Sequence, residues 1–343
     1  MVNAKDWVVV GLDNGGTANN ATVLNHEGSF LVDGLVEVPS RVLDGPDVAV
    51  ESLAGAFDNI LAVTKVERSR VVAVGLDTPG PASANGVISS KGATNFSQPA
   101  WWGFDFRGAL ERRLGLPVIY NNDGNAAALY AHHVYFGQDA HTRSSVSAIV
   151  GTGLGGGVIE QGKVIKGAAG MAGELGHVRI PLDGLLAPEQ PVPRCNCGLA
   201  GDLESIASLS GIARNLLPFW LTRYPGHPLA DVEPGLAAKQ VRDYGERGDE
   251  LAGRIFAQQA MAIGRMFTIA ANVLDPDAYF VGGGVTDTGV AFRTAFVERV
   301  REATDLRTEQ AGVATFAIVP DLDMAGARGS ALAALRAIRP SSL

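Results

Sequence analysis

The pattern of apolar and polar positions repeats in two parts of the chain. In residues 7–32 and again in residues 147–165, short runs of Val, Ile and Leu are separated first by a glycine-rich turn and then by a tight turn. Such runs between turn residues are typical of β-strands joined as hairpins. We therefore expect two related domains, each opening with an antiparallel meander. The expected strands are residues 7–12, 21–25 and 29–32 in the first stretch, and 147–150, 157–159 and 163–165 in the second.

Helical and strand patterns alternate along the rest of the chain, which indicates an α/β architecture. We expect an N-terminal domain of residues 1–121 and a larger C-terminal domain of residues 122–327, with a last helix at about 328–343 packing back on the first domain. The expected helices cover about 52–66, 106–114, 125–134, 203–217, 251–274, 290–303 and 330–338, and the expected strands cover 71–76, 117–120 and 278–281.

Length and charge narrow the class of protein. A chain of 343 residues that is 46% hydrophobic has room for two domains with a sizeable core. Its net charge of −8, without a basic block, makes it a poor candidate for binding nucleic acid or an anionic membrane. There is no apolar run long enough to span a membrane, and the first residues lack the apolar core of a signal peptide. These features predict a cytoplasmic protein.

Glycine clusters mark the first candidate site. Asp13-Asn14-Gly15-Gly16-Thr17 follows the first expected strand. Backbone N–H groups at such a turn can hold a phosphate, and the carboxylate can orient a metal ion. The same residues also suit a plain hairpin turn with a polar start, so the turn alone leaves both interpretations open.

The densest glycine cluster is residues 151–157, which contains a formal G-x-G-x-x-G at Gly151, Gly153 and Gly156. A dinucleotide-binding turn of this kind needs a helix directly after it. Here residues 158–165 have a strand–turn–strand pattern instead. We therefore favour a phosphate-binding turn between two strands, with Thr152 at its tip.

Asn122 and Asp123 lie between an expected strand and an Ala-rich helix. Asp123 suits the N-cap of that helix. A carboxylate at the carboxyl end of a strand is also well placed to take a proton from a substrate hydroxyl. Both roles remain open on the residues alone.

A second polar group combines Glu174 and His177 with the two cysteines, Cys195 and Cys197. One intervening residue makes a disulfide between these cysteines strained, so metal binding or simple burial is favoured. His177 with Cys195 and Cys197 supplies three ligands of a tetrahedral zinc site, and Asp202 is the candidate fourth. Asp202 also suits a helix N-cap, and Glu204 suits the first turn of that helix.

Six segments in this order resemble the ROK family of sugar kinases and their regulator relatives, in the actin/hexokinase-like superfamily. The resemblance covers nearly the whole chain and implies two related actin/hexokinase-like (ribonuclease H-like) α/β domains with a hinged cleft. The segments are residues 12–17, 75–81, 122–128 and 151–157, then 172–177 with 195–204, and 275–276 with 281–285.

The resemblance implies ATP-dependent phosphorylation of a hexose hydroxyl, usually O6, with Asp123 as general base. It implies a small-molecule sugar and Mg²⁺-ATP as ligands, structural Zn²⁺, and a homo-oligomer, a dimer or tetramer. The residues it implies for the sugar are Asn95, Asn122, Asp123, Glu174, His177 and Glu204. Those for phosphates and nucleoside are Asp13, Gly15, Gly16, Thr17, Gly151, Thr152, Gly153, Gly283 and Gly284. Those for zinc are His177, Cys195, Cys197 and Asp202.

The sequence departs from the family pattern in several places. Asp202 stands where the family usually has a third cysteine, and a carboxylate is a harder zinc ligand than a thiolate. Ala18 replaces a lysine that often follows the first glycine turn, and Ala131 replaces a glutamate of the Ala-rich helix. Residues 178–194 form a longer segment than the family pattern suggests. These departures bear on the substrate and the metal more than on the reaction class.

Three other classes of protein are alternatives to a hexose kinase. A sugar-responsive repressor needs an N-terminal DNA-binding domain, for which we expect no room before the strand at residue 7. A kinase that forms acyl phosphates needs arginines around its acceptor, whereas acids and a histidine are present. A non-catalytic sugar-binding relative is the remaining alternative. Glucose-type hexoses are the first expectation for the acceptor, with Trp101 and Trp102 as candidate selectors.

Overall fold

The computed structural model describes residues 6–80, 82–89 and 95–339, which form two compact units. The first unit comprises Met1–Gln138, Val164–Gly173 and Pro320–Leu343, and the second comprises Asp139–Lys163 and Glu174–Val319. Pro81 of the second family segment and residues 340–343 of the expected last helix lie outside the described residues.

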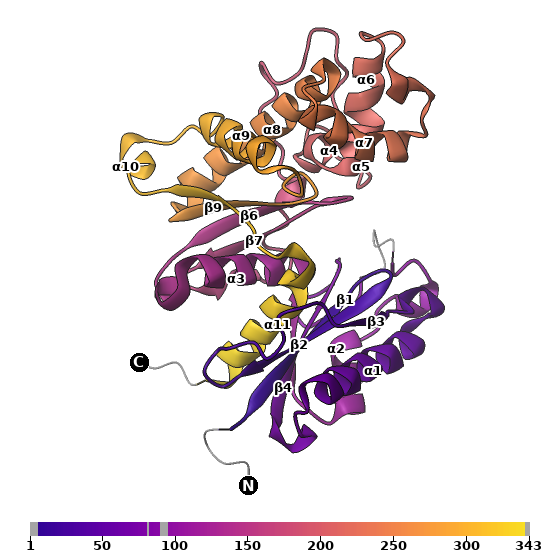
Figure 1. Ribbon diagram of the computed structural model, residues 1–343, viewed down its shortest axis with the longest axis vertical. Coiled ribbons are helices and arrows are strands. Elements are labelled where there is room, and N and C mark those ends of the chain that lie inside the picture. Colours follow the sequence, from indigo (N-terminus) through magenta and orange to yellow (C-terminus); the bar gives the residue numbers. More distant parts are fainter. Residues whose placement is uncertain (1–5, 81, 90–94, 340–343) are drawn as a thin grey trace. The chain divides into compact units, whose positions relative to one another are not determined.

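The first unit is built on a five-stranded sheet of order β3-β2-β1-β4-β5 (Figure 1). Strand β1 pairs antiparallel with β2 and parallel with β4, and β4 pairs parallel with β5. The carboxyl ends of three parallel strands therefore lie at one edge of the sheet. The strands are β1 Val8–Asn14, β2 Ala18–Asn25, β3 Glu37–Pro39, β4 Val71–Thr78 and β5 Val118–Asn122.

Helices cover both faces of this sheet because successive residues of a buried strand point to opposite faces. Val8, Val10 and Leu12 of β1 share a core with α1 (Pro46–Thr64) and α2 (Phe106–Leu114). The alternate residues face α11 (Leu322–Ile338), which packs beside α3 (Asp123–Phe136).

Glycine is needed where α11 meets the sheet. A Cβ on Gly75 would lie 1.9 Å from the carbonyl oxygen of Ser330, and one on Gly11 would lie 1.9 Å from that of Ala327. Any side chain at these positions would push the helix off the strands. The glycines therefore set how closely α11 approaches β1 and β4.

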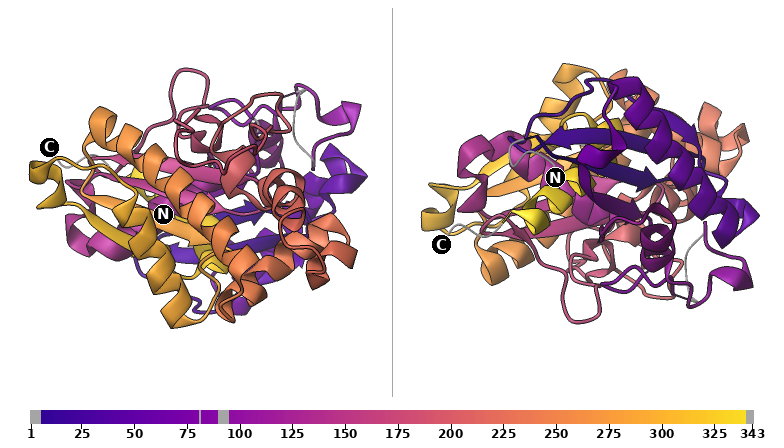
Figure 2. Two further views of the ribbon diagram at one scale, coloured as in Figure 1. Left: turned by 90° about the horizontal axis from the view of Figure 1, so that it is seen from above. Right: turned by 90° about the horizontal axis from the view of Figure 1, so that it is seen from below.

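The second unit repeats the same connections in a sheet of order β10-β9-β6-β7-β8. Strand β6 pairs antiparallel with β7 and parallel with β9, and β9 pairs parallel with β10. The left view of Figure 2 shows helix α8 (Glu250–Leu274), in orange, lying across this unit, where α9 (Val290–Glu302) packs beside it. The strands are β6 Ser145–Val150, β7 Leu154–Glu160, β8 Lys163–Val164, β9 Ala278–Gly283 and β10 Thr315–Ile318. The duplicated α/β architecture expected from the sequence is confirmed.

Three details differ from the sequence expectations. The third strand of the first meander is Glu37–Pro39, and residues 29–32 make only the bridge between Leu24 and Phe30. The compact units divide the chain after Gln138, not after residue 121, since α3 packs against α11. The sequence patterns also missed helix α7 (Pro234–Glu246) and strand β10.

The helix expected at 203–217 is broken into short pieces. Ser208 adopts an extended conformation, and its hydroxyl accepts a hydrogen bond from Gly211 N–H, which starts a new helical segment. The pieces are α4 Glu204–Ala207, α5 Leu209–Gly211, a π-helical turn Ile212–Leu216 and α6 Leu217–Leu221. This break places Glu204 at the start of a separate one-turn helix.

Among the described residues, every helix is too short or too polar to cross a lipid bilayer.

Candidate functional site

The carboxyl edge of the first sheet carries a row of acidic and amide side chains. Asp13 of β1 is in register with Asp77 of β4, and Asp77 is in register with Asn121 of β5. Residues in register on parallel strands point to the same face. Asp123 follows directly as the first residue of α3. The first unit therefore gathers the predicted phosphate and base residues at one sheet edge.

The turn after β1 is held by amide side chains that the sequence patterns did not single out. Asn14 Nδ2 donates to Asn19 Oδ1 at 2.7 Å, and Asn20 Nδ2 donates to Asp13 Oδ2 at 3.0 Å. Gly15 N–H donates to the carbonyl of Ala18 at 2.9 Å, which closes the hairpin. The hairpin interpretation is thus correct in geometry, and it leaves the phosphate role open.

Asn95, predicted to bind sugar, lies against this turn. A Cβ on Gly16 would lie 2.9 Å from Asn95 Oδ1. Any side chain at position 16 would displace that amide. Gly16 and Asn95 therefore belong to one cluster, together with the exposed Thr17.

Asp77 is a buried acid beside Asp13. Its side chain is fully buried, and Ser330 Oγ donates a hydrogen bond to Asp77 Oδ2 at 2.7 Å. Burial raises the pKa of Asp77 well above its usual value, and the neighbouring Asp13 and Asp123 raise it further. Burial also raises the pKa of Asp13, opposed by hydrogen bonds from Asp77 and Asn20. Sequence reasoning gave Asp77 no role, although an acid inside an apolar strand is a readable signal.

Asp123 is exposed, and Asn122 is the residue that caps α3. Asn122 Oδ1 accepts a hydrogen bond from Asn125 N–H at 3.2 Å, as an N-cap does. Asp123 Oδ1 accepts from Gly124 N–H at 2.6 Å. The capping role considered for Asp123 therefore belongs to Asn122. Asp123 is left as an oriented carboxylate at the protein surface.

In the second unit, the predicted phosphate turn joins β6 to β7, with Val150 opposite Leu154. A strand therefore follows the glycines, and the preference against a dinucleotide-binding turn is confirmed. The turn is exposed at Gly151 and Thr152. Backbone N–H groups of the segment after α4 donate hydrogen bonds to it. Leu209 N–H donates to Gly151 O at 3.0 Å, and Ser210 N–H donates to Thr152 O at 3.1 Å.

Gly283 and Gly284 lie beside this turn at the end of β9. Gly284 N–H donates to Val150 O at 2.9 Å. Gly283 has φ of +92°, and a Cβ there would lie 1.9 Å from the Val150 carbonyl. Only glycine allows this approach, so the predicted phosphate and nucleoside residues lie beside one another within the second unit.

Glu174 directly precedes a single 3₁₀ turn, Leu175–His177, and His177 is the last residue of that turn. A Cβ on Gly176 would lie 2.5 Å from Leu154 O, so this glycine lets the turn press against β7. Burial raises the pKa of Glu174, and the charge of Glu204 adds to this while His177 opposes it. The acids and histidine predicted for the sugar hydroxyls thus lie near one another within this unit.

His177, Cys195, Cys197 and Asp202 form a compact donor cluster. Each offers one ligand atom, and these atoms all lie within 4.8 Å of one another. His177 Nδ1 lies 3.6 Å from Cys197 Sγ and 3.5 Å from Asp202 Oδ2, and that oxygen lies 3.8 Å from Cys197 Sγ. Neighbouring ligands of tetrahedral zinc are about 3.3–3.8 Å apart, given metal–ligand distances of about 2.0–2.3 Å. The donor set therefore fits a zinc ion.

Hydrogen bonds within this cluster shift the titration of its members. The bond with Asp202 raises the pKa of His177 to about 9, although burial opposes this. Burial alone would raise the pKa of Asp202, but bonds from His177 and Ser205 bring it below its usual value. Ser205 N–H donates to Asp202 Oδ1 at 3.1 Å, so Asp202 contacts the first turn of α4 and also lies in the donor cluster, while its role as a zinc ligand remains a prediction.

Glu204 touches both the donor cluster and the phosphate turn. Its Oε1 accepts from Cys195 Sγ at 3.1 Å, and its Oε2 accepts from Leu154 N–H at 2.9 Å. The sequence could not reveal the second contact, because the two residues are 50 positions apart.

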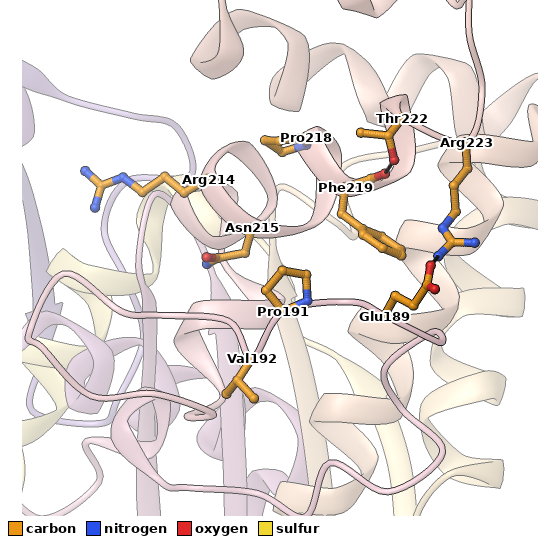
Figure 3. Close-up of a pocket in the computed structure, with 9 residues that line it drawn as sticks. All are labelled: Glu189, Pro191, Val192, Arg214, Asn215, Pro218, Phe219, Thr222 and Arg223. Carbon is orange, nitrogen blue, oxygen red and sulfur yellow. Dashed lines mark hydrogen bonds and ion pairs between the residues drawn. The ribbon is translucent and has the colours of Figure 1, made fainter.

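A hollow of about 540 Å³ lies elsewhere in the second unit (Figure 3). The ion pair between Arg223 and Glu189 closes one end, and the Phe219 ring and Pro191 line its middle. It contains none of the predicted site residues. Its lining residues are Glu189, Pro191, Val192, Arg214, Asn215, Pro218, Phe219, Thr222 and Arg223.

The duplicated sheet with a glycine turn after the first strand of each copy defines the actin/hexokinase-like class of two-domain proteins. The sequence profile of the ROK family matches residues 9–337. The chain therefore belongs to the ROK family.

Relatives and solved structures agree with this assignment. A glucokinase of Halalkalibacterium halodurans is 33% identical over 284 residues, 82% of this chain and 81% of the relative. An N-acetyl-D-glucosamine kinase of Escherichia coli is 33% identical over 236 residues, 66% of this chain and 69% of the relative.

The ROK hexokinase of Thermus thermophilus has a TM-score of 0.74 at 30% identity, with 96% of this chain and 99% of that chain covered. The ROK glucokinase of Streptomyces griseus, solved in complex with glucose and AMPPNP, has a TM-score of 0.67 at 26% identity, with the same coverage.

Proposed function

We propose that this protein is an ATP-dependent sugar kinase that phosphorylates a glucose-type hexose, at O6, with Asp123 as general base. The observation that carries the proposal is the exposed, oriented carboxylate of Asp123 at the sheet edge that also bears Asp13. The glucokinase and hexokinase relatives support the reaction class and favour catalysis over the non-catalytic sugar-binding alternative. Relatives that act on different sugars leave the acceptor as part of the proposal.

The first unit would supply the proton acceptor and one phosphate turn. Phosphoryl transfer depends mainly on positioning and on stabilising charge, so an oriented carboxylate and several N–H donors suffice. Asp123 would take the proton of the sugar hydroxyl as that oxygen attacks the terminal phosphorus of ATP. Gly15, Gly16 and Thr17 would face the phosphates, and Asp13 would hold Mg²⁺, which neutralises charge on the transferred group.

The second unit would hold the sugar and the rest of the nucleotide. Within this unit, Glu174, His177 and Glu204 would bind sugar hydroxyls. Within the first unit, Asn95 and Asn122 are proposed for the same kind of contact. The turn Gly151–Gly153 would face the phosphates, and Gly283 and Gly284 would lie against the nucleoside. A polyhydroxyl acceptor suits this set because carboxylates and imidazole accept hydrogen bonds from hydroxyl groups.

Zinc is part of the proposal, held by His177, Cys195, Cys197 and Asp202. Zinc would fix the loop that carries Cys195 and Cys197, beside Glu204. Metal analysis of the purified protein tests this, and an absence of bound zinc would contradict it. We also propose a cytoplasmic homo-oligomer, a dimer or tetramer, which light scattering would test.

The experiment that tests the function is ADP release with Mg²⁺-ATP across a panel of hexoses, including glucose, mannose, fructose and N-acetylglucosamine. We expect sugar-dependent release that is highest with glucose and that falls by at least ~10²-fold in Asp123→Asn. Asp58→Asn is the control, because Asp58 is also an exposed acid of the first unit. Silence across the panel with intact sugar binding would favour the non-catalytic alternative. Activity unchanged in Asp123→Asn would refute the assignment of the base.

A further inference from the structure

Glu204 makes two directed contacts that binding a sugar does not require. Its Oε2 accepts the Leu154 N–H at 2.9 Å, directly after the turn Gly151–Gly153. Its Oε1 accepts the Cys195 thiol at 3.1 Å. The Leu154 contact holds the carboxylate against the turn whether Cys195 is a thiol or, with zinc bound, a thiolate.

The turn itself is built to receive this carboxylate. A Cβ on Gly153 would lie 2.7 Å from Glu204 Oε2, so glycine leaves the space that the carboxylate occupies. The carbonyls of Gly151 and Thr152 are held by the N–H groups of Leu209 and Ser210. Glu204 supplies the one side-chain carboxylate in the contacts recorded for this turn within the described residues.

We propose that Glu204 is a positioning residue for the phosphate turn Gly151–Leu154, in addition to its place among the sugar ligands. By accepting the Leu154 N–H, it fixes the conformation in which the turn meets the nucleotide. A carboxylate has about four acceptor sites, so the two contacts leave room for sugar hydroxyls. This inference rests on the proposed function in taking the turn as the site of the ATP phosphates.

Two substitutions separate positioning from sugar binding. Glu204→Gln keeps a carbonyl oxygen that can accept the Leu154 N–H, but it loses the charge. Glu204→Met has a similar length without a strong acceptor, so it loses the contact while it fills most of the volume. Loss of a hydrogen bond to a preorganised turn should therefore appear in the methionine variant alone.

The measurement is the affinity for Mg²⁺-AMPPNP by calorimetry in the absence of sugar, together with the KM for glucose. We expect Glu204→Met to bind AMPPNP about 10-fold more weakly, which corresponds to one hydrogen bond of about 1.4 kcal/mol. Glu204→Gln should stay within about 2-fold of wild type for AMPPNP. Both variants should raise the KM for glucose.

Glu174→Ala is the matched control, because Glu174 is a neighbouring acid of the proposed sugar set with no recorded contact to the turn. It should raise the KM for glucose and leave AMPPNP affinity unchanged. Equal AMPPNP affinity in wild type and Glu204→Met, or equal weakening in the glutamine and methionine variants, would overturn the inference. If Glu204→Met does not fold, weakening in Glu204→Gln alone would overturn it. Wild type that binds no AMPPNP would overturn the proposed function as well.

Discussion

The two sheets of this protein begin with the same hairpin, but they obtain their carboxylate in different ways. In the first unit the acid, Asp13, belongs to the strand before the turn and is held by Asn20 across the hairpin. In the second unit the acid, Glu204, comes from a one-turn helix and reaches the turn at Leu154. The contact of Asp13 with Asn20 is local in sequence, whereas the contact of Glu204 with Leu154 joins residues 50 positions apart.

The two carboxylates differ in how firmly the backbone holds them and in what they can contact. A carboxylate inside a strand is rigid, because the ladder of hydrogen bonds fixes its backbone, and this suits the metal-orienting role proposed for Asp13. A carboxylate on a separate short helix can contact the turn and the donor cluster together. The second turn is therefore linked through Glu204 to the donor cluster.

The largest expected effect concerns the acid of the first turn. Asp13→Asn should lower kcat/KM for Mg²⁺-ATP by roughly 100-fold, because a charge aimed at the phosphates and Mg²⁺ is lost. Steady-state kinetics across a Mg²⁺ titration measures this, with Asp44→Asn as an exposed control. A loss no greater than that of Glu204→Met would erase the distinction between the two turns.

An intermediate effect concerns the packing of α11 against the strands of the first sheet. Gly75→Ala places a methyl group 1.9 Å from the Ser330 carbonyl, so α11 must shift. Overpacking of this kind costs about 1–3 kcal/mol. Urea denaturation should show that loss, while Gly55→Ala, with no atom within 4 Å of the added Cβ, should stabilise α1 by about 0.5–1 kcal/mol. Equal free energies of unfolding in the two variants would mean that Gly75 does not determine how closely α11 approaches β4.

The smallest expected effect concerns the buried acid beside the first turn. Because the pKa of Asp77 is raised in the folded state, the folded protein favours its protonated form. The group's contribution to stability is therefore fully present below about pH 4 and is lost as the pH rises through the raised folded pKa. Asp77→Asn removes this pH-dependent loss of stability, because asparagine does not ionise.

Melting temperatures of wild type and Asp77→Asn, measured from pH 4 to pH 8 without Mg²⁺, would test this. The two curves should diverge as the pH rises, with Asp77→Asn the more stable by a few degrees at pH 8, at about 2–4 °C per kcal/mol. Parallel curves would show that Asp77 does not titrate differently on folding.

The sequence predicted what depends on neighbouring residues and missed what depends on distant ones. Strands β1 and β6 and their glycine turns were predictable, because apolar runs and glycines are local signals. The break at Ser208 was not, since a hydroxyl that caps Gly211 competes with a pattern that otherwise reads as one helix. The short strand β3 lacks an apolar run, so its pairing with β2 appears only in the fold.

The site shows the same division. Asp13 lies near the end of β1 and Asp123 directly follows β5, so their positions at the sheet edge could be predicted, whereas the roles assigned to them remain predictions. Asp77 was a readable signal as an acid in an apolar strand, but its place beside Asp13 and its hydrogen bond from Ser330 of the last helix appear only in the fold. The contact of Glu204 with Leu154 likewise exists only after the chain has folded.

The path of the chain also constrains the order in which the protein can mature on the ribosome. The chain leaves the first unit after Gln138, returns for Val164–Gly173, and returns again at Pro320, so that α11 completes the first unit last. Until the final helix emerges, Gly11 and Gly75 face no partner and one side of the first sheet stays uncovered. Synthesis from the N-terminus therefore cannot finish the first unit before the second, and the nascent chain depends on α11 to cover the sheet that was made first.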